Sequence, residues 1–217
     1  MKDYLTITNE DNMKLMARYP DNYFELAIVD PPYGINADDK NSTDKKQSKK
    51  SAFKSRNYGE QKWDNAIPND EYFAELKRVS KRQVVWGANF FNLQGGMLFW
   101  YKQVTMPTYS QGELAWLSWL NKVDFVSIAW HGMIQHDMKN KEVRIHPTQK
   151  PVKLYEFLLM NYAKEGDKIL DTHLGSGSIA IACHNLGFDL TGCELDTEYY
   201  DAACKRLKQH QAQLTIF

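Results

Sequence analysis

The tetrapeptide Asp30-Pro31-Pro32-Tyr33 combines residue types that are suited to chemistry on an amine. Asp30 offers carboxylate oxygens and Pro31 offers a carbonyl oxygen, whereas neither proline has a backbone N–H to donate. Tyr33 adds a flat aromatic face beside these acceptors. Two acceptors next to a stacking surface suit a planar ring with an exocyclic amino group, as in a nucleobase. The alternative interpretation is an ordinary strand end, at which Asp and Pro only interrupt a sheet.

A glycine turn at 171–178, Asp-Thr-His-Leu-Gly-Ser-Gly-Ser, is the second stretch with ligand-binding character. Gly175 and Gly177 let the backbone approach a ligand closely, and the following helix offers free N–H groups at its start. Glu194 comes about 20 positions after the turn, where an acidic residue binds ribose hydroxyls in dinucleotide folds. Because the sequence contains neither G-x-G-x-x-G nor G-x-x-x-x-G-K-[ST], an adenosine-bearing cofactor other than NAD or ATP is predicted. His173 either contacts that cofactor or packs over the turn.

The elements that must position these residues follow from the apolar patterning. Strands are predicted over 4–8, 26–29, 84–86, 97–101, 125–130, 168–170 and 188–193, and helices over 12–19, 71–80, 151–162, 179–186 and 197–209. This alternation indicates an α/β domain, in which ligands bind at the carboxyl ends of the parallel strands. Asp11 follows the first strand, so it is placed to line such a site, and it is equally placed to cap the next helix.

Composition limits the class of protein. A chain of 217 residues with 43% hydrophobic content fits a single α/β domain over 1–217. Basic and acidic residues number 27 each, so the net charge is zero. Any basic surface that binds nucleic acid must therefore be confined to one part of the protein. The three cysteines lack C-x-x-C spacing, which indicates reduced thiols in a cytoplasmic protein. No H-x-x-x-H pair or 18-residue apolar run occurs, so we expect no metal site, secretion signal or membrane span.

A polar segment at 36–62 is predicted to be a mobile basic loop. Between Lys45 and Arg56 it contains basic residues and no acidic one, and it has too little apolar surface to fold by itself. Next to the Asp-Pro-Pro-Tyr motif, such a loop is predicted to close on a polyanion, with Phe53 and Tyr58 as stacking groups. The plainer alternative is a solvated surface loop. The candidate DNA-binding residues are Lys45, Lys46, Lys49, Lys50, Lys54 and Arg56.

Four motifs, in this order along the chain, resemble those of one enzyme family. They are Asp-Pro-Pro-Tyr at 30–33, His-Pro-Thr-Gln-Lys-Pro at 146–151, Asp-x-x-x-Gly-Ser-Gly at 171–177 and Gly-Cys-Glu at 192–194. They are similar to the motifs of the S-adenosylmethionine-dependent DNA amino methyltransferases of the permuted β group, of phage and bacterial type. The resemblance covers nearly the whole chain. It implies a circularly permuted Rossmann-like fold, with a seven-stranded, mostly parallel sheet, helices on both faces and an N-terminal strand that completes the cofactor half.

The resemblance also implies a role for each motif. Asp30 and the Pro31 carbonyl would hold the N6 amine of an adenine flipped out of double-stranded DNA, Tyr33 would stack on that base, and Pro32 completes the catalytic motif. The Thr148 and Lys150 side chains are expected near the methionine end of S-adenosylmethionine, with Glu194 on the ribose. The full set of candidate cofactor-binding residues is Asp11, Thr148, Lys150, Asp171, His173, Gly175, Ser176, Gly177 and Glu194.

The chain departs from the family pattern in three places. Thr172-His173 stands where the family usually has Pro-Phe, and Ser178 stands where it usually has Thr. The target-recognition region at 118–145 is short, which predicts weak discrimination between DNA sequences. Three other functions stay open: methylation of cytosine N4, whose enzymes more often have Ser in place of Asp30; methylation of an RNA or protein amine; and a catalytically silent DNA-binding module.

The tail at 212–217 suggests a protein partner. Its last residues, Gln-Leu-Thr-Ile-Phe at 213–217, are similar to the short peptides that dock on the bacterial sliding clamp, and two apolar anchors suit a groove. The alternative is a tail that packs on its own domain. A homodimer is the other assembly that we consider, in a bacterial cell or a phage-infected host.

Overall fold

The computed structural model describes residues 4–35, 67–104, 110–131 and 133–213. Its sheet has β2 (Leu26–Val29) near the middle, and every side chain of this strand is buried. Leu26 and Ile28 pack into one hydrophobic core, whereas Ala27 and Val29 pack into a second core on the opposite face. A strand that is buried on both faces has no polar side to show, which explains its continuous apolar sequence.

Within the described residues the main sheet has eight strands. Their order is β1 (Leu5–Asn9), β10 (Asp189–Glu194), β9 (Lys168–Asp171), β2, β3 (Gln83–Trp86), β5 (Gly112–Leu117), β4 (Gly96–Tyr101) and β6 (Val123–Ser127). The first five of these run parallel, β5 is antiparallel to both of its neighbours, and β6 runs parallel to β4. The N-terminal strand pairs with the last strand, with Leu5 opposite Leu190, so the two ends of the chain meet in one half of the sheet.

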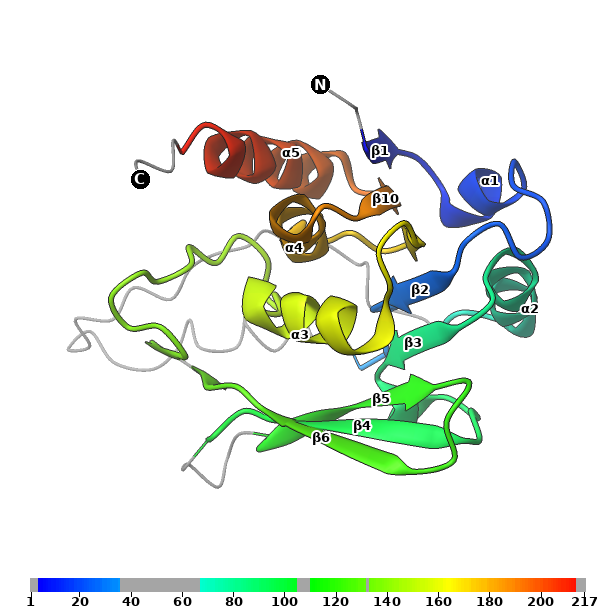
Figure 1. The fold of residues 1–217 in the computed structure, drawn as a ribbon, viewed down its shortest axis with the longest axis horizontal. Helices are drawn as coiled ribbons and strands as arrows, with labels where there is room; N and C mark the ends of the chain where they lie inside the picture. The colour runs from blue at the N-terminus through cyan, green and yellow to red at the C-terminus, as the bar shows by residue number, and fades with distance from the viewer. Residues whose placement is uncertain (1–3, 36–66, 105–109, 132, 214–217) are drawn as a thin grey trace.

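Helices cover both faces of this sheet (Figure 1). The helices α3 (Val152–Tyr162), α4 (Ser178–Leu186) and α5 (Thr197–Gln211) pack into one core. The helices α1 (Asn12–Met16) and α2 (Asp70–Val79) pack into the other. The expected mixed, mostly parallel sheet between two helical layers is therefore confirmed.

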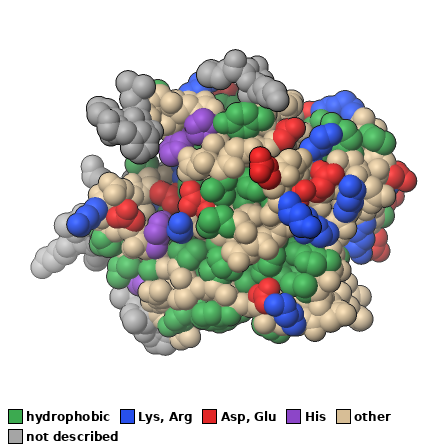
Figure 2. Space-filling view, in the orientation of Figure 1, with side chains coloured by type: hydrophobic (Ala, Val, Ile, Leu, Met, Phe, Trp, Pro, Cys, Tyr) green, Lys and Arg blue, Asp and Glu red, His purple; other side chains and the backbone are tan. Residues whose placement is uncertain are grey.

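The strand count of seven is a correction, because β5, which the apolar patterning did not predict, lies between β3 and β4 as an eighth strand. At the far end of the sheet, β6 pairs with β4 and so supplies partners for the backbone N–H and C=O groups on that edge of β4. Val123 and Phe125 of this strand stay largely exposed. Figure 2 shows hydrophobic side chains gathered over this end of the molecule, where β4 to β6 lie.

Two predicted elements end three residues earlier in the structure, whereas the bounds of the other predicted elements agree to within two residues. The strand expected over 125–130 ends at Ser127, and Trp130 instead starts a small hairpin of β7 (Trp130–His131) and β8 (Ile134–Gln135). Trp130 leaves the sheet because its indole N–H donates to the Gln149 carbonyl at 2.7 Å. The first helix ends at Met16 instead of 19, since Pro20 cannot continue it and the last turn tightens to i−3 hydrogen bonds.

Several predictions fall outside the described residues. These include the six candidate DNA-binding residues at 45–56, Phe53 and Tyr58 in the same segment, and all but the first residue of the terminal peptide at 213–217. They stay predictions. Among the residues that are described, no helix is both long and apolar enough to span a membrane.

Candidate active site

The candidate site lies where the carboxyl ends of β1, β10, β9 and β2 meet. A cavity of about 440 Å³ opens at this edge of the sheet. Its lining includes these predicted site residues: Asp11, Asp30, Pro32, Thr148, Lys150, His173, Gly175, Ser176 and Glu194. Pro31, Tyr33, Asp171 and Gly177 do not line the cavity, although each directly neighbours a lining residue in the chain or contacts one. The structure therefore brings most of the predicted site residues to one cavity.

Asp30 is held on both carboxylate oxygens. The Tyr33 hydroxyl donates a hydrogen bond to Oδ1 at 2.5 Å, and the Lys150 ammonium donates one to Oδ2 at 2.5 Å. Lys150 also donates to the Tyr33 hydroxyl at 3.3 Å. Each carboxylate oxygen can accept a second hydrogen bond, so Asp30 keeps acceptor sites for a further amine. The structure thus places Lys150 at the Asp30 carboxylate, whereas the resemblance had implied a position near the methionine end of the cofactor.

Lys150 is the centre of a larger charge cluster, because its side chain is only 2% exposed. Its ammonium also lies 3.1 Å from Oε2 of Glu113, and Glu113 in turn pairs with Lys102. Burial alone would raise the pKa of Glu113, but Lys150 and Lys102 outweigh burial and hold that pKa at about 2. Burial would likewise lower the pKa of Lys150, yet Asp30 and Glu113 raise it above its ordinary value. Both groups are therefore charged at neutral pH.

The ring of Tyr33 is packed firmly in place. Phe90 stacks on it with a centroid separation of 4.9 Å and an interplanar angle of 15°. Gly87 lies against the ring, with φ at +76°, and a Cβ at this position would come within 2.2 Å of Cε1 of Tyr33. Only glycine combines this backbone conformation with so close an approach. No room for a base exists between Tyr33 and Phe90, so base stacking on Tyr33 stays a prediction.

The glycine turn and Glu194 form one hydrogen-bonded unit. Gly175 N–H donates to Oε2 of Glu194 at 2.8 Å, and Asp196 N–H donates to Oε1 at 3.0 Å. Burial raises the pKa of Glu194, and these backbone donors oppose the rise. Gly177 has φ at +69° and is the residue before α4, so it turns the chain into the helix.

His173 makes hydrogen bonds through both ring nitrogens. Asn12 Nδ2 lies 3.1 Å from its Nε2, and Thr172 Oγ1 lies 2.9 Å from its Nδ1. Burial lowers the pKa of His173 to about 4, so the ring is neutral and serves as acceptor at one nitrogen and donor at the other. Thr172 is bonded in turn to the Tyr72 hydroxyl at 2.8 Å. The pair Thr172-His173 thus lines the cavity with a polar network at the position where the family usually has an aromatic side chain.

Two predicted alternatives for Asp11 are both realised. Its side chain accepts the N–H of Lys14 at 3.1 Å and so caps α1, and it also lines the cavity. Asp171 is different, because it is buried beside the cavity with Oδ1 accepting the N–H of His173 at 2.9 Å. Burial, with Asp30 and Glu194 adding to it, raises the pKa of Asp171 to about 8.

The His-Pro-Thr-Gln-Lys-Pro motif forms a second wall of the cavity. His146 Nδ1 lies 3.1 Å from Thr148 Oγ1, and its ring contacts the ring of Tyr199 at a centroid separation of 4.3 Å. Burial, together with the charge of Lys150, lowers the pKa of His146 to about 3, so this ring is also neutral.

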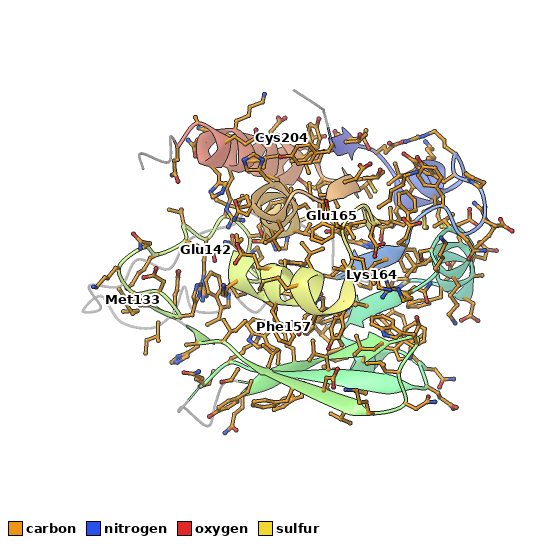
Figure 3. The ribbon with its side chains drawn as sticks, in the orientation of Figure 1. Met133, Glu142, Phe157, Lys164, Glu165 and Cys204 are labelled. Carbon is orange, nitrogen blue, oxygen red and sulfur yellow. The ribbon has the colours of Figure 1, made fainter. Side chains whose placement is uncertain are left out.

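A partly buried ion pair connects the segment at 133–145 to the glycine turn. Glu142, which Figure 3 shows beside the start of α3, accepts from Arg206 at 2.7 Å and from Val152 N–H at 3.0 Å. Arg206 also donates to the Ser176 carbonyl and to the Ser178 hydroxyl, both at 2.9 Å. The family's usual Thr at 178 is therefore replaced by a hydroxyl that still has a structural partner.

Several functional candidates were missed at the sequence level. Glu113 belongs to the charge cluster, and Tyr72, Tyr155 and Asn12 line the cavity. Of the two adjacent aromatic residues of α2, Tyr72 is buried and Phe73 is partly buried against the same core. None of these residues lies in the four ordered motifs given above. Among the described residues, no group of three or more His, Cys, Asp or Glu side chains is placed to hold a metal ion.

Known proteins match this chain at the level of sequence. The family model N6_N4_Mtase, described as DNA methylase, matches residues 52–205. The type II methyltransferase M.HpaI of Haemophilus parainfluenzae is 40% identical over 68 residues, which are 31% of this chain and 22% of that protein. The type II methyltransferase M2.DpnII of Streptococcus pneumoniae is 43% identical over 63 residues, 29% of this chain and 24% of that protein. Each of these two matches thus spans about a quarter of the length of the curated relative.

Solved structures match the fold over nearly the whole chain. The crystal structure of the M1.HpyAVI–SAM complex matches with a TM-score of 0.56 at 19% identity, covering 93% of this chain and 99% of that one. The cytosine-N4-specific PvuII DNA methyltransferase matches with a TM-score of 0.57 at 13% identity, covering 95% and 93%. These likenesses establish a Rossmann-like methyltransferase fold. Because the family model also matches most of the sequence, the chain belongs to the N6_N4_Mtase family of DNA methylases.

Proposed function

We propose that this protein transfers the methyl group of S-adenosylmethionine to N6 of adenine in double-stranded DNA. The observation that carries the proposal is the Asp30 carboxylate, held at the carboxyl edge of the sheet and facing a cavity with a glycine turn on the other side. Family membership supports amine methylation on DNA. The choice of adenine rests on Asp30, because the cytosine-N4 enzymes of this family more often have Ser at that position.

The cavity suits a positively charged adenosine cofactor. Its volume of about 440 Å³ lies within the range of roughly 300–1,000 Å³ that is usual for cofactor sites. The charged residues in the described lining are four carboxylates, those of Glu10, Asp11, Asp30 and Glu194, and one ammonium, that of Lys150. That ammonium is already paired with Asp30. A phosphate-bearing cofactor would meet mostly negative charge, whereas a sulfonium cation is favoured there.

The residues that would hold the cofactor follow from this fit. Glu194, fixed by two backbone N–H groups, is placed to accept hydrogen bonds from ribose hydroxyls. Asp11, Asn12 and His173 form a polar wall beside it. When bound, S-adenosylmethionine supplies a methyl group that is already activated on its sulfonium, so the protein contributes mainly alignment and charge.

The remaining chemistry belongs to the amine. An aryl amine is a poor nucleophile because its lone pair is delocalised into the ring. Asp30 and the Pro31 carbonyl accept its hydrogens, which favours a pyramidal nitrogen with the lone pair directed at the methyl group. Asp30 is tied to an ammonium and a phenol, so it serves here as a charged acceptor that orients the amine. The base must leave the duplex to reach it, at a cost of roughly a few kcal/mol.

The test is transfer of a tritiated methyl group from S-adenosylmethionine to unmethylated duplex DNA, followed by mass spectrometry of the nucleosides. N6-methyladenine is the expected product. If N4-methylcytosine is found instead, the substrate is cytosine and not adenine. If calorimetry shows cofactor binding but DNA yields no methylated base, RNA and protein amines are the next substrates, and failure on all three leaves a silent DNA-binding module.

A further inference from the structure

We propose that Glu113 is a positioning residue for methyl transfer, which acts on Asp30 through Lys150. This inference rests on the proposed function, because Asp30 is there the residue that orients the target amine. Within the described structure, Glu113 does not itself line the cavity; it contacts Lys150, which does. Its influence on the reaction therefore has to pass through the shared lysine.

The sheet topology brings Glu113 to the site. Ala115 of β5 lies opposite Trp86, the last residue of β3, and β5 runs antiparallel to β3. Glu113 therefore lies just beyond the carboxyl end of β3, at the same edge of the sheet as Asp30. Gly112, the residue before it, packs so closely on Phe99 and on the Trp100 carbonyl that a Cβ would lie within 2.4 Å of both. This contact fixes the start of β5 and with it the position of Glu113.

The cluster forms a line of alternating charges. Lys102 pairs with Glu113, Glu113 lies 3.1 Å from the Lys150 ammonium, and Lys150 lies 2.5 Å from Asp30. Two ammonium groups and two carboxylates leave no net charge. A buried charge without a partner costs several kcal/mol, so each member depends on its neighbours. Glu113 supplies the second carboxylate that keeps Lys150 protonated.

The arrangement divides the charge of Lys150 between two carboxylates. An ammonium that served Asp30 alone would neutralise more of its charge and weaken it as an acceptor for the amine. Glu113 binds the Lys150 ammonium from the side opposite Asp30. The ammonium is therefore fixed in position, and it keeps Oδ2 of Asp30 in place. Aromatic rings restrict the ammonium further, since it lies 5.2 Å from the ring centroid of Trp86 and 5.8 Å from that of Tyr33. Small errors in such positioning cost roughly a hundredfold in rate.

Glu113→Gln tests this role in the full chain. Calorimetry should give Kd values for S-adenosylmethionine and duplex DNA within about twofold of the unmodified protein, while the single-turnover rate falls roughly tenfold to a hundredfold. The alkaline limb of the pH–rate profile should move to lower pH, because Lys150 has lost one of the two carboxylates that raise its pKa. Glu113→Asp should restore part of the rate. Glu75→Gln, which breaks a pair with Arg78 far along α2, is the matched control.

Two further measurements keep the result decisive. If Lys102 left unpaired destabilises the single variant, Lys102→Met with Glu113→Gln removes one charge of each sign and should show the same rate loss. The pKa of Lys150, read by NMR of 13C-labelled lysine and assigned with Lys150→Met, should fall in Glu113→Gln, and this readout requires no activity. An unchanged Lys150 pKa, or a folded variant with the unmodified protein's rate and pH profile, overturns the inference. Absence of DNA methylation by the unmodified protein would instead count against the proposed function.

Discussion

Nζ of Lys150 lies 2.5 Å from Oδ2 of Asp30, although 120 residues separate them in the chain. Asp30 follows β2 and Lys150 precedes α3. This ion pair therefore joins the Asp-Pro-Pro-Tyr motif to the second wall of the cavity. The pair also explains why a lysine can be almost fully buried at a site where most lining charges are negative.

Replacement of Asp30 should separate catalysis from cofactor binding. In Asp30→Ala the target amine loses its charged acceptor, so we expect methyl transfer to fall by at least roughly 10²–10³-fold. The cofactor affinity should stay close to that of the unmodified protein, because Glu194 and the glycine turn are intact. Radiolabel transfer and calorimetry measure the two quantities. Asp30→Asn, which keeps the side-chain volume, is the control for packing, and equal loss of both quantities would contradict the division of roles.

Gly87→Ala should disturb the site through Tyr33. A Cβ at Gly87 would lie 2.2 Å from Cε1 of Tyr33, so the ring must move and its hydroxyl leaves Oδ1 of Asp30. Gly187→Ala is a matched control, because its φ of +74° is close to the +76° of Gly87 and a Cβ there meets nothing within 4 Å. Both variants should lose about 1 kcal/mol of stability from backbone strain. Only Gly87→Ala should also lose activity, and equal activity in the two would refute the contact argument.

The sequence was informative wherever a structure depends on neighbouring residues. The bounds of β2, the start of α2 after Asn69 and the turn at Gly177 follow from local patterns of apolar, capping and glycine residues. The extra strand β5, which is antiparallel to both β3 and β4, and the pairing of β6 with β4 depend instead on contacts between distant segments. No local pattern specifies those pairings.

The site shows the same division. Asp30, Gly175 and Glu194 lie in motifs and were found from sequence, and the structure brings all three to one cavity. Glu113 matters only through a long-range ion pair with Lys150, and Tyr155 only because α3 turns it toward the cavity. Tyr72 and Phe73 are adjacent and aromatic, so which of them is buried more deeply depends on how α2 packs against the sheet.

The stability of the protein should carry a pH signature from Asp171. The pKa of Asp171 is raised to about 8 in the folded protein from an ordinary value of 3.8, so folding takes up a proton between those values. The stabilisation from this group is complete below about pH 3.8, declines as the pH rises and is lost above about pH 8. Asp171→Asn keeps an acceptor for the His173 N–H but does not titrate. As the pH rises, the unfolding free energy of the unmodified protein should therefore fall relative to that of Asp171→Asn, by at most about 1.4 kcal/mol per pH unit. Urea unfolding from pH 5 to pH 8 measures it; a pH-independent difference would show that Asp171 is ionised at neutral pH.

Tyr155 should contribute a hydroxyl to ligand binding. Its side chain is only 7% exposed and lines the cavity, and within the described residues its hydroxyl has no hydrogen-bond partner. Burial, with Asp30 and Asp171 adding to it, raises the pKa of Tyr155 well above its ordinary value, so the group stays a neutral O–H. Because Tyr155 lines the cavity, a bound ligand can supply a hydrogen-bond partner for this hydroxyl. Tyr155→Phe should therefore fold at least as stably as the unmodified protein yet bind S-adenosylmethionine roughly tenfold more weakly, as expected for one lost hydrogen bond to a ligand.

Tyr162→Phe is the control, because the Tyr162 hydroxyl bonds Asp124 away from the cavity lining, and this variant should bind the cofactor normally. Equal affinity in Tyr155→Phe, measured by calorimetry, would mean that the hydroxyl faces bulk water in the complex and takes no part in recognition.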